Sequence, residues 1–306
     1  MILVLWNCEQ ELPQCLGPLA AEDADLSIDM ICVDNASEDG SVTIAREHGA
    51  LVVEMGTNVG FPVAVNAGLG HVTGDYVLLL NPDVVLVPGV VSRCLQELQG
   101  DPGIGMVGCN LRLADGSADL GAARRFRSLP GIAFETLGLT RLTMRLDVQY
   151  VPDRARRESR DVDCINGAFM LLSTDLLRWL GGLDETAFMY LEDQDLCRRV
   201  WDHGLRVRFV AEAIATHVGG ASTRRASAER QTIAYLHRTD ADVEMIARRH
   251  GACARLVALA LFGLRALFGL LVGVVRKDHV LRSRYAATLS WLSRQVPART
   301  PPPPIR

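Results

Sequence analysis

Short apolar runs alternate with segments of helical spacing through the first hundred residues of the chain. The apolar runs lie at residues 2–5, 28–33, 51–53, 76–80 and 104–107 and are typical of buried strands. The segments between them, near 11–19, 41–48, 62–71 and 88–99, have the spacing of helices. This alternation predicts an α/β fold, Rossmann-like, whose mostly parallel central sheet is covered by helices on both faces.

The pattern changes in the second hundred residues. Residues 110–160 are less regular and predict a variable loop over the site, and order returns at 164–172. A helix is predicted over 193–203, because acidic residues occupy its first turn and Gly204 follows its end. Two short strands are predicted after it, at 207–210 and 213–217, and then a turn at Gly219-Gly220.

The last 80 residues differ in kind. Residues 256–275 are 20 positions of mostly apolar type interrupted by Arg265, with basic residues on both sides. That length suits a membrane span, while the central arginine and the flanking charge suit a helix lying at a membrane interface or a hairpin-like insertion. A soluble core helix is the third interpretation. The chain is therefore divided into a catalytic domain, 1–223, and a C-terminal helical region, 224–306, with a disordered proline-rich end at 301–304.

Composition and charge narrow the class of protein. The 306 residues are 49% apolar, which predicts a folded enzyme. Residues 224–306 hold 15 Lys and Arg against 5 Asp and Glu, a balance of +10, whereas residues 1–223 hold 17 against 31, a balance of −14. Because the basic region is also apolar, we interpret its charge as attraction to anionic lipid and expect no nucleic-acid partner.

The cysteines and the N-terminus indicate the compartment. The eight cysteines form no CxxC pair and no cluster at zinc spacing, so neither a disulfide framework nor a structural zinc is indicated. Residues 1–6 have the pattern of a buried strand and lack the features of an export signal. We therefore expect a cytoplasmic protein, peripheral to or anchored at the inner face of the cell membrane.

Polar residues follow two of the predicted strands. In open α/β sheets ligands bind beyond the carboxyl ends of the strands, so both clusters are expected at one edge of the sheet. Asp34 ends the second apolar run, and its carboxylate can accept hydrogen bonds from a pyrimidine base or a ribose hydroxyl. For Ser37 and Asp39, further along the same cluster, we favour a helix-capping role.

Three other positions carry candidate chemistry. Asn81-Pro82-Asp83 follows the apolar run at 76–80, and its oxygen ligands suit Mg²⁺ or Mn²⁺ bridging a diphosphate, although the same residues suit a simple turn. Glu192-Asp193 precedes the predicted helix and supplies either a general base or a cap. His217 ends an apolar run and is a candidate metal ligand, although a lone histidine is more often structural.

Taken in order, these motifs resemble those of family 2 glycosyltransferases with a GT-A fold, in particular the rhamnosyltransferase-like branch that builds cell-surface polysaccharides. The resemblance covers about residues 1–223. It is carried by Val33-Asp34-Asn35-Ala36-Ser37, Asn58-Val59-Gly60-Phe61 with Asn66, Leu80-Asn81-Pro82-Asp83, Asn166-Gly167-Ala168, the run from Met189 to Leu196, and His217. One departure is Asn81, which stands where the common Asp-x-Asp motif has its first carboxylate.

The resemblance implies a role for each matching residue. Asp193 is the expected catalytic base, with Glu192 beside it orienting the acceptor. Asp83 and His217 are the expected ligands of a divalent cation, Mg²⁺ or Mn²⁺. The expected donor-binding residues are Asp34, Asn35, Asn58, Gly60, Asn66 and Asn81, and Gly167 and Ala168 are expected on the acceptor side. The implied reaction is a single displacement with inversion, from a dTDP- or UDP-sugar to a glycan or a polyprenyl-linked glycan.

Two competing functions remain to be weighed. The glycines from Gly68 to Gly74 are wrongly spaced for a dinucleotide loop, and Lys277, the only lysine, lies far from any P-loop pattern, so another class of nucleotide-using enzyme is disfavoured. A degenerate glycosyltransferase acting as a membrane-tethered binding subunit is the second alternative. The retained Asp83, Asp193 and His217 argue against it, because a binding role needs no base.

Overall fold

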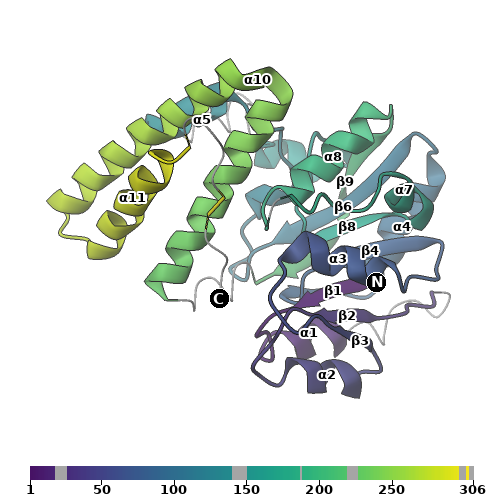
Figure 1. Ribbon diagram of the computed structural model, residues 1–306. Coiled ribbons are helices and arrows are strands. Elements are labelled where there is room, and N and C mark those ends of the chain that lie inside the picture. Colours follow the sequence, from purple (N-terminus) through teal and green to yellow (C-terminus); the bar gives the residue numbers. More distant parts are fainter. Residues whose placement is uncertain (18–25, 140–149, 187, 219–226, 296–300, 303–306) are drawn as a thin grey trace. The chain divides into compact units, whose positions relative to one another are not determined.

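The computed structural model describes residues 1–17, 26–139, 150–186, 188–218, 227–295 and 301–302 (Figure 1). The predicted turn at Gly219-Gly220 and residues 303–304 of the predicted disordered end lie outside these residues. The chain forms two compact units, which are described separately below. The first unit comprises Met1–Arg125, Val151–Phe188 and Glu192–Ser222, and the second comprises Phe126–Tyr150, Met189–Leu191 and Thr223–Arg306.

The first unit is built on one mixed sheet of nine strands in the order β3-β2-β1-β4-β8-β6-β9-β5, with β7 paired to β9. Strands β1 to β4 pair in parallel, β8 runs antiparallel between β4 and β6, and β6 pairs in parallel with β9. The strands are β1 (Ile2–Leu5), β2 (Ile31–Asp34), β3 (Leu51–Glu54), β4 (Tyr76–Leu80), β5 (Val84–Val85), β6 (Ile104–Arg112), β7 (Arg160–Asp161), β8 (Phe169–Ser173) and β9 (Arg206–His217). The predicted α/β class is confirmed.

Helices connect these strands and pack on the sheet (Figure 1). They are α1 (Leu12–Leu16), α2 (Ser41–Glu47), α3 (Phe61–Leu69), α4 (Val90–Gly100), α7 (Thr174–Trp179) and α8 (Glu192–Asp202), with short 3₁₀ turns η2 (Leu120–Ala122) and η3 (Asp153–Arg157). Helix α3 packs closely because Gly68 has no side chain: a Cβ there would lie 2.9 Å from Val33 and 3.0 Å from Ile2. Close packing of α3 fixes the loop that precedes it.

Two predictions about this unit are corrected. Residues 207–210 and 213–217 form one strand, β9, because residues 211–213 bulge out of its pairing with β6: Cys109 lies opposite Val210 and Asn110 opposite Ile214. The Asn110 side chain donates to the carbonyl of Ala211 at this bulge, at 2.9 Å. The described parts of the stretch 110–160, residues 110–139 and 150–160, contain the end of β6 and, in the second unit, helix α5 (Leu129–Thr136), which Ser128 caps, so they are more regular than predicted.

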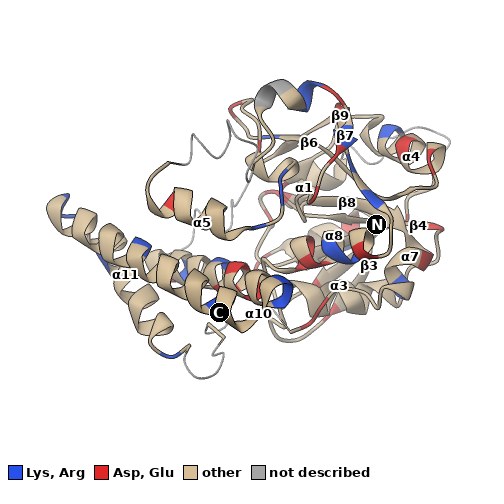
Figure 2. Cartoon of the chain, turned by 90° about the horizontal axis from the view of Figure 1, so that it is seen from above, with Lys and Arg blue, Asp and Glu red and all other residues tan. Residues whose placement is uncertain are grey.

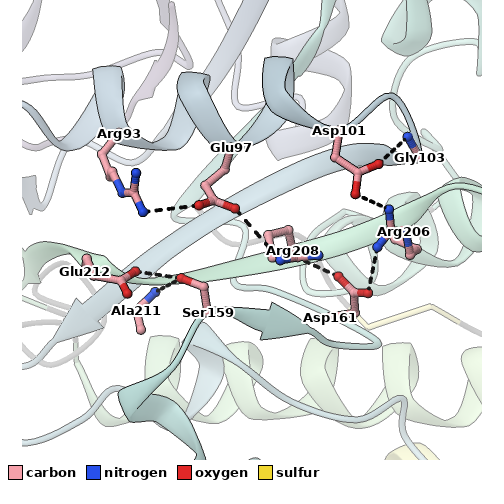
Figure 3. A network of polar contacts seen from close by, with 10 residues as sticks. All are labelled: Arg93, Glu97, Asp101, Gly103, Ser159, Asp161, Arg206, Arg208, Ala211 and Glu212. Atoms are coloured by element: carbon pink, nitrogen blue, oxygen red, sulfur yellow. Dashed lines mark hydrogen bonds and ion pairs between the residues drawn. The ribbon is translucent and has the colours of Figure 1, made fainter.

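A partly exposed ion network fastens the start of β9 to its neighbours (Figure 3). Arg206 pairs with Asp101 at 2.5 Å and with Asp161 at 3.2 Å, and Arg208 pairs with the same Asp161 at 2.8 Å. The hydrogen bonds and ion pairs lower the pKa of Asp101 and raise that of Arg206. These charges satisfy one another across α4, β7 and β9, so we assign the network a structural role.

The second unit is helical. Helix α10 (Ala228–Val275) packs on α5 and on α11 (His279–Leu292), with Ile132, Val243, Ile246, Ala258 and Phe262 in the core. Helix α10 is broken at Gly251, whose φ of 81° and ψ of −174° are not helical. Because φ lies in the left-handed region, glycine is the residue that tolerates this break. The apolar residues 256–275 therefore belong to the segment of α10 that follows the break.

A buried ion cluster joins α5 to α10 in this unit. Arg127 pairs with Glu135 at 2.7 Å and with Asp242 at 3.0 Å, and Arg265 pairs with Glu135 at 3.0 Å. Burial lowers the pKa of Arg127, but its carboxylate partners outweigh burial and keep the guanidinium charged. In these ion pairs of the described residues, two cations face two carboxylates, so the paired charges balance.

Candidate active site

The end of β2 and the loop before α3 are joined by side-chain amides. Asn35 accepts a hydrogen bond from the Val59 N–H at 2.8 Å and donates to Asn58 Oδ1 at 2.8 Å. Asn58 Oδ1 also accepts from the Gly60 N–H at 3.2 Å. The predicted donor residues Asn35, Asn58 and Gly60 therefore lie together, although they belong to two loops that are separated in the sequence.

Asp34 ends β2 and is 4% exposed. Its carboxylate accepts from the Ser37 N–H, so the turn after β2 folds back onto it. The Ser37 hydroxyl accepts from the Asn7 N–H at 3.1 Å and does not cap α2, which corrects the predicted capping role of Ser37. Asp39 does accept from the N–H of Ser41, the first residue of α2, at 3.0 Å.

Gly60 is required by its surroundings. Its φ is +88°, and a Cβ there would lie 2.7 Å from the Phe188 carbonyl, which also accepts from the Phe61 N–H at 3.1 Å. Asn66, two turns into α3, exchanges hydrogen bonds of 2.8 Å with the backbone of Leu183 and donates to Glu185. The contacts of Asn66 are thus internal ones that hold the 183–185 segment against α3.

The Asn81-Pro82-Asp83 turn follows β4. Its first amide, Asn81 N–H, donates to the Ala168 carbonyl at 3.0 Å, and the Asp83 carbonyl accepts from the Val218 N–H at 2.9 Å. The short strand β5 pairs antiparallel with the end of β9, with Val84 opposite His217. This pairing brings the Asp83 carboxylate within 3.5 Å of His217 Nε2. The two predicted metal ligands, 134 residues apart, therefore meet.

A residue that the sequence did not indicate completes this arrangement. Asp119 Oδ2 lies 2.7 Å from His217 Nδ1, on the side of the ring away from Asp83. Burial acts to lower the pKa of His217, but hydrogen bonds to Asp119 and Asp83 outweigh it and raise the pKa to about 9. Burial acts to raise the pKa of Asp119, but the hydrogen bond to His217 outweighs it and leaves the pKa below its ordinary value.

Hydrogen bonds from Asn166 and Arg156 hold the loop that carries Asp119. Asn166 donates to Asp119 Oδ2 at 3.1 Å, and its own oxygen accepts from the Ala168 N–H at 3.0 Å. Arg156 is 2% exposed and donates to the backbone carbonyls of Asp119, Leu120, Ala123 and Val151. A buried guanidinium bonded to four carbonyls fixes the path of the chain, so Asp119 is held in place.

Asp193 lies in the first turn of α8 and is 8% exposed. Its carboxylate forms an ion pair with Arg124 and accepts from the Gln194 N–H. Arg124 is positioned by two backbone hydrogen bonds of 3.0 Å with Cys164. A Cβ on Gly167 would lie 3.4 Å from Asp193 Cβ and 3.7 Å from Glu192 Oε1. The 166–168 turn therefore adjoins the predicted base.

Among the described residues, no cluster of three or more His, Cys, Asp or Glu side chains could enclose a metal ion. The pair Asp83 and His217 offers one oxygen and one nitrogen ligand instead. This donor set fits a Mg²⁺ or Mn²⁺ ion that takes its other ligands from water and substrate phosphates. The hydrogen bond to Asp119 is the kind of contact that fixes the ring orientation of a metal-binding histidine.

Comparison with known proteins decides the family. Residues 1–171, more than half of the chain, match the family described as glycosyl transferase family 2. The chain belongs to glycosyltransferase family 2. It is therefore an enzyme that transfers sugars, and the resemblance found in the sequence is confirmed.

Two curated relatives of this family 2 enzyme are rhamnosyltransferases. The N-acetylglucosaminyl-diphospho-decaprenol L-rhamnosyltransferase of Mycobacterium tuberculosis (strain H37Rv) is 29% identical over 211 residues, which cover 65% of this chain and 69% of the relative. The rhamnosyltransferase WbbL of Escherichia coli K12 is 25% identical over 225 residues, covering 71% and 82%. Both alignments are longer than the 171 residues that match the family.

Solved structures confirm the GT-A fold. The mannosyltransferase PcManGT of Pyrobaculum calidifontis, solved with GDP-mannose and Mn²⁺, has a TM-score of 0.59 and 17% identity, covering 96% of this chain and 86% of its own. TarS of S. aureus, residues 1–349, has a TM-score of 0.52 and 13% identity, covering 95% and 88%. At these identities the likeness is one of fold.

Sequence reasoning about this family 2 enzyme missed Asp119, Arg124 and Arg156. All three lie in the irregular stretch 110–160, where no strand end marks a position as part of the site. One signal was available for Arg124, since Arg124-Arg125-Phe126-Arg127 is a basic cluster within an acidic domain. Nothing in the local sequence distinguishes Asp119 from the neighbouring Asp115.

Proposed function

We propose that the protein is an inverting glycosyltransferase that moves L-rhamnose, or a related sugar, from a nucleoside diphosphate to a polyprenyl-linked glycan in cell-surface polysaccharide synthesis. The sugar and the acceptor class are suggested by the names of the two rhamnosyltransferases. The observation that carries the reaction type is the Asp83–His217–Asp119 arrangement at the end of β5 and β9. It supplies a cation site where a diphosphate can leave.

The donor is received by the loops after β2 and β4. Asp34 accepts hydrogen bonds from the nucleoside, and the Asn35–Asn58 pair with Gly60 shapes the pocket beside it. Asn81 contributes an uncharged oxygen ligand or a hydrogen bond to the diphosphate. A divalent cation, when bound by Asp83 and His217, neutralises the charge that develops on the departing nucleoside diphosphate.

Asp193 is the general base in this proposal. It takes the proton from an acceptor hydroxyl while that oxygen attacks the anomeric carbon, and the bond to the diphosphate breaks on the opposite face, which inverts the configuration. Glu192 orients the acceptor, and the small residues Gly167 and Ala168 leave room for it. Arg124 holds Asp193 before substrate binds, because the two side chains form an ion pair.

The acceptor class implies a location at the cytoplasmic membrane. A polyprenyl-linked glycan keeps its lipid in the bilayer, so the enzyme must reach the inner membrane surface to use it. One helix of the described chain, α10, is long and apolar enough to cross a membrane by length and composition.

The proposal is tested by a thermal-shift screen of nucleotide sugars with and without Mn²⁺. A bound donor stabilises the folded protein by mass action, about 2.7 kcal/mol at a hundredfold excess over Kd. We expect dTDP-rhamnose with Mn²⁺ to raise Tm more than UDP-glucose does, and the inverted product to be found by NMR when a polyprenyl-linked acceptor is added. Stabilisation by a UDP-hexose alone would replace rhamnose as the donor. A protein stabilised by none of these sugars would support the binding-subunit alternative.

A further inference from the structure

One face of α10 beyond Gly251 carries exposed apolar side chains along its whole length. Eight large ones are between 48% and 75% exposed: Leu256, Val257, Leu264, Leu267, Phe268, Leu271, Val274 and Val275. At about 100° of rotation per residue they fall within an arc of about 120°, so they form one continuous stripe. We call these eight residues the apolar stripe. No charged residue lies within it.

The opposite face of the same segment is packed against protein. Ala258, Phe262, Ala266, Gly269 and Gly273 are buried, and a Cβ on Gly269 would collide with the Tyr285 ring of α11. The glycines therefore let α11 lie close to α10 on this side. Only 33% of the most apolar window of α10 is buried in the described structure, so its two faces differ sharply in surroundings.

Arg265 lies outside the apolar stripe. Its guanidinium pairs with Glu135 of α5 at 3.0 Å, on the side where α5 and α11 pack. The charge in the middle of the apolar sequence is thus neutralised by the protein. In sequence, Arg265 interrupts the apolar segment, whereas in space it leaves the exposed face uninterrupted.

Positive charge surrounds the apolar stripe. From residue 245 to residue 295 the chain has nine Lys and Arg and one acidic residue, Asp278. Arg248 and Arg249 are exposed before the stripe, and Arg276 and Lys277 are exposed after it. Arg248 also pairs with Glu244 of the preceding turn. Figure 2 shows α11 as a mostly tan ribbon interrupted by blue.

We propose that the apolar stripe lies in the interface of an anionic phospholipid bilayer, with α10 parallel to the membrane surface and not across it. A spanning helix would place both of its faces, including the side on which Arg265 and Glu135 pair, at the depth of the acyl chains. A helix on the surface places only the stripe there, while the basic residues at its two ends meet lipid head groups. This inference deepens the membrane location proposed above and is independent of the sugar.

A second copy of the chain is a poorer occupant of the stripe. Pairing two stripes in antiparallel fashion brings Arg248 and Arg249 of one copy to Arg276 and Lys277 of the other. Parallel pairing brings each basic end of one copy to the same basic end of the other copy. Both arrangements juxtapose like charges, because Glu244 and Asp278 offset only two of these four basic residues in each copy, and such contacts disfavour association.

The inference is tested by co-sedimentation of the full-length protein with vesicles. We expect binding to equal parts of phosphatidylcholine and phosphatidylglycerol, and much weaker binding to phosphatidylcholine alone. Phe268→Glu with Leu264→Glu should weaken binding at least about tenfold, because two exposed apolar side chains are replaced by charge. Leu51→Glu, a change at an apolar side chain that is 50% exposed in the first unit, is the matched control and should leave binding unchanged.

Two further readouts can overturn it. If the stripe variant keeps full vesicle binding, the stripe is not the lipid contact, and if it instead converts a dimer to a monomer in light scattering, a second copy covers it. The depth of residue 267 in the bilayer is measured by quenching with brominated lipids. The fluorophore is attached to the cysteine of the Leu267→Cys variant in a Cys253→Ser background. Shallow bromines should quench it most, and strongest quenching by bromines at the bilayer centre would indicate a span.

Donor binding by the same variant, followed by thermal shift without vesicles, separates this inference from the proposed function. We expect it to equal that of the wild type. A variant that binds donor but not vesicles supports both proposals, whereas wild-type protein that binds vesicles but no donor retains the membrane inference and contradicts the proposed reaction.

Discussion

The two units of the molecule both bury charged side chains, and they balance them differently. In the helical unit, Arg127 and Arg265 meet Glu135 and Asp242, two cations against two carboxylates. In the α/β unit, Asp83 and Asp119 meet the His217 imidazole and Asp193 meets the Arg124 guanidinium, so three carboxylates face two cationic groups.

This difference distinguishes a structural cluster from a binding site. A neutral cluster of ion pairs is complete within the fold, and it joins segments that are distant in the chain. A cluster with excess carboxylates retains capacity for a cation or for a proton from a substrate. The same chemical groups therefore indicate a structural role in one unit and a catalytic role in the other. Four experiments test this contrast.

The largest effect is expected from Asp193→Asn. Because asparagine cannot accept the acceptor's proton, sugar transfer should fall about 10²–10⁴-fold, the range that general-base catalysis contributes. Donor binding, followed by thermal shift, should be retained, because the change is nearly isosteric. Initial rates of product formation measure the effect.

Asp202→Asn is the matched control for the base. Asp202 is in the same helix, α8, and pairs with Arg198 on the surface, at 2.8 Å with side chains 37% and 49% exposed. Its substitution should leave the transfer rate within about twofold, since exposed ion pairs contribute little. A transfer rate for Asp193→Asn equal to that of Asp202→Asn would remove Asp193 from the mechanism.

Breaking the neutral cluster should instead affect stability. Arg127→Met removes the guanidinium that lies 3.0 Å from the buried Asp242 carboxylate, and removal of one partner from a buried pair costs about 3–5 kcal/mol. Urea denaturation followed by circular dichroism should show the loss. Arg46→Met, in an exposed pair with Glu54, is the comparison and should cost about 0–1 kcal/mol. Equal costs for the two variants would contradict the assignment of the buried cluster as structural.

Asp119→Asn tests the orienting contact in the α/β unit. Loss of a carboxylate behind a metal-binding histidine typically costs 10–100-fold in metal affinity, so Mn²⁺ should bind about that much more weakly. Calorimetry of Mn²⁺ binding in the presence of nucleoside diphosphate measures this without catalysis. Asp115→Asn, in the exposed turn four residues earlier, should bind Mn²⁺ as the wild type does. An unchanged affinity in Asp119→Asn would mean that Asp119 does not orient His217 for metal.

The sequence predicted the parts of the site that are fixed by strand ends. Asp34 and Asn81 directly follow buried apolar strands, so the parallel topology alone puts them at one edge. His217 was identifiable because it ends a strand. Its contact with Asp83, however, depends on β5, and a strand of two residues is too short to recognise from a sequence pattern.

Other features depend on tertiary contacts that a linear pattern does not carry. Asp119 reaches His217 because Arg156, 37 residues away, binds the carbonyls of its loop. The continuity of β9 depends on its pairing with β6 on both sides of the bulge at residues 211–213. The three interpretations of residues 256–275 could not be separated by composition, because the side of the helix that holds Arg265 is set by Glu135 in α5, 130 residues earlier.

The cysteines give the smallest effect and compare the two units directly. The seven cysteines of the α/β unit are buried, and Cys253, in the helical unit, is exposed. Burial raises the pKa of Cys8 to about 11, so its thiol stays protonated where a free thiol ionises near pH 9. The folded protein favours the neutral thiol of Cys8. The contribution of this thiol to the free energy of unfolding is therefore present below pH 9 and is lost as pH rises through about 11. At pH 8 a maleimide should therefore label one thiol per native chain and eight in urea, counted by mass spectrometry.

Cys253 precedes the apolar stripe by three residues, nearly one helical turn, so anionic vesicles should slow its labelling severalfold while phosphatidylcholine vesicles leave it unchanged. Fast labelling of a second native thiol would show that the α/β unit opens, and equal rates in both kinds of vesicle would place Cys253 away from the lipid.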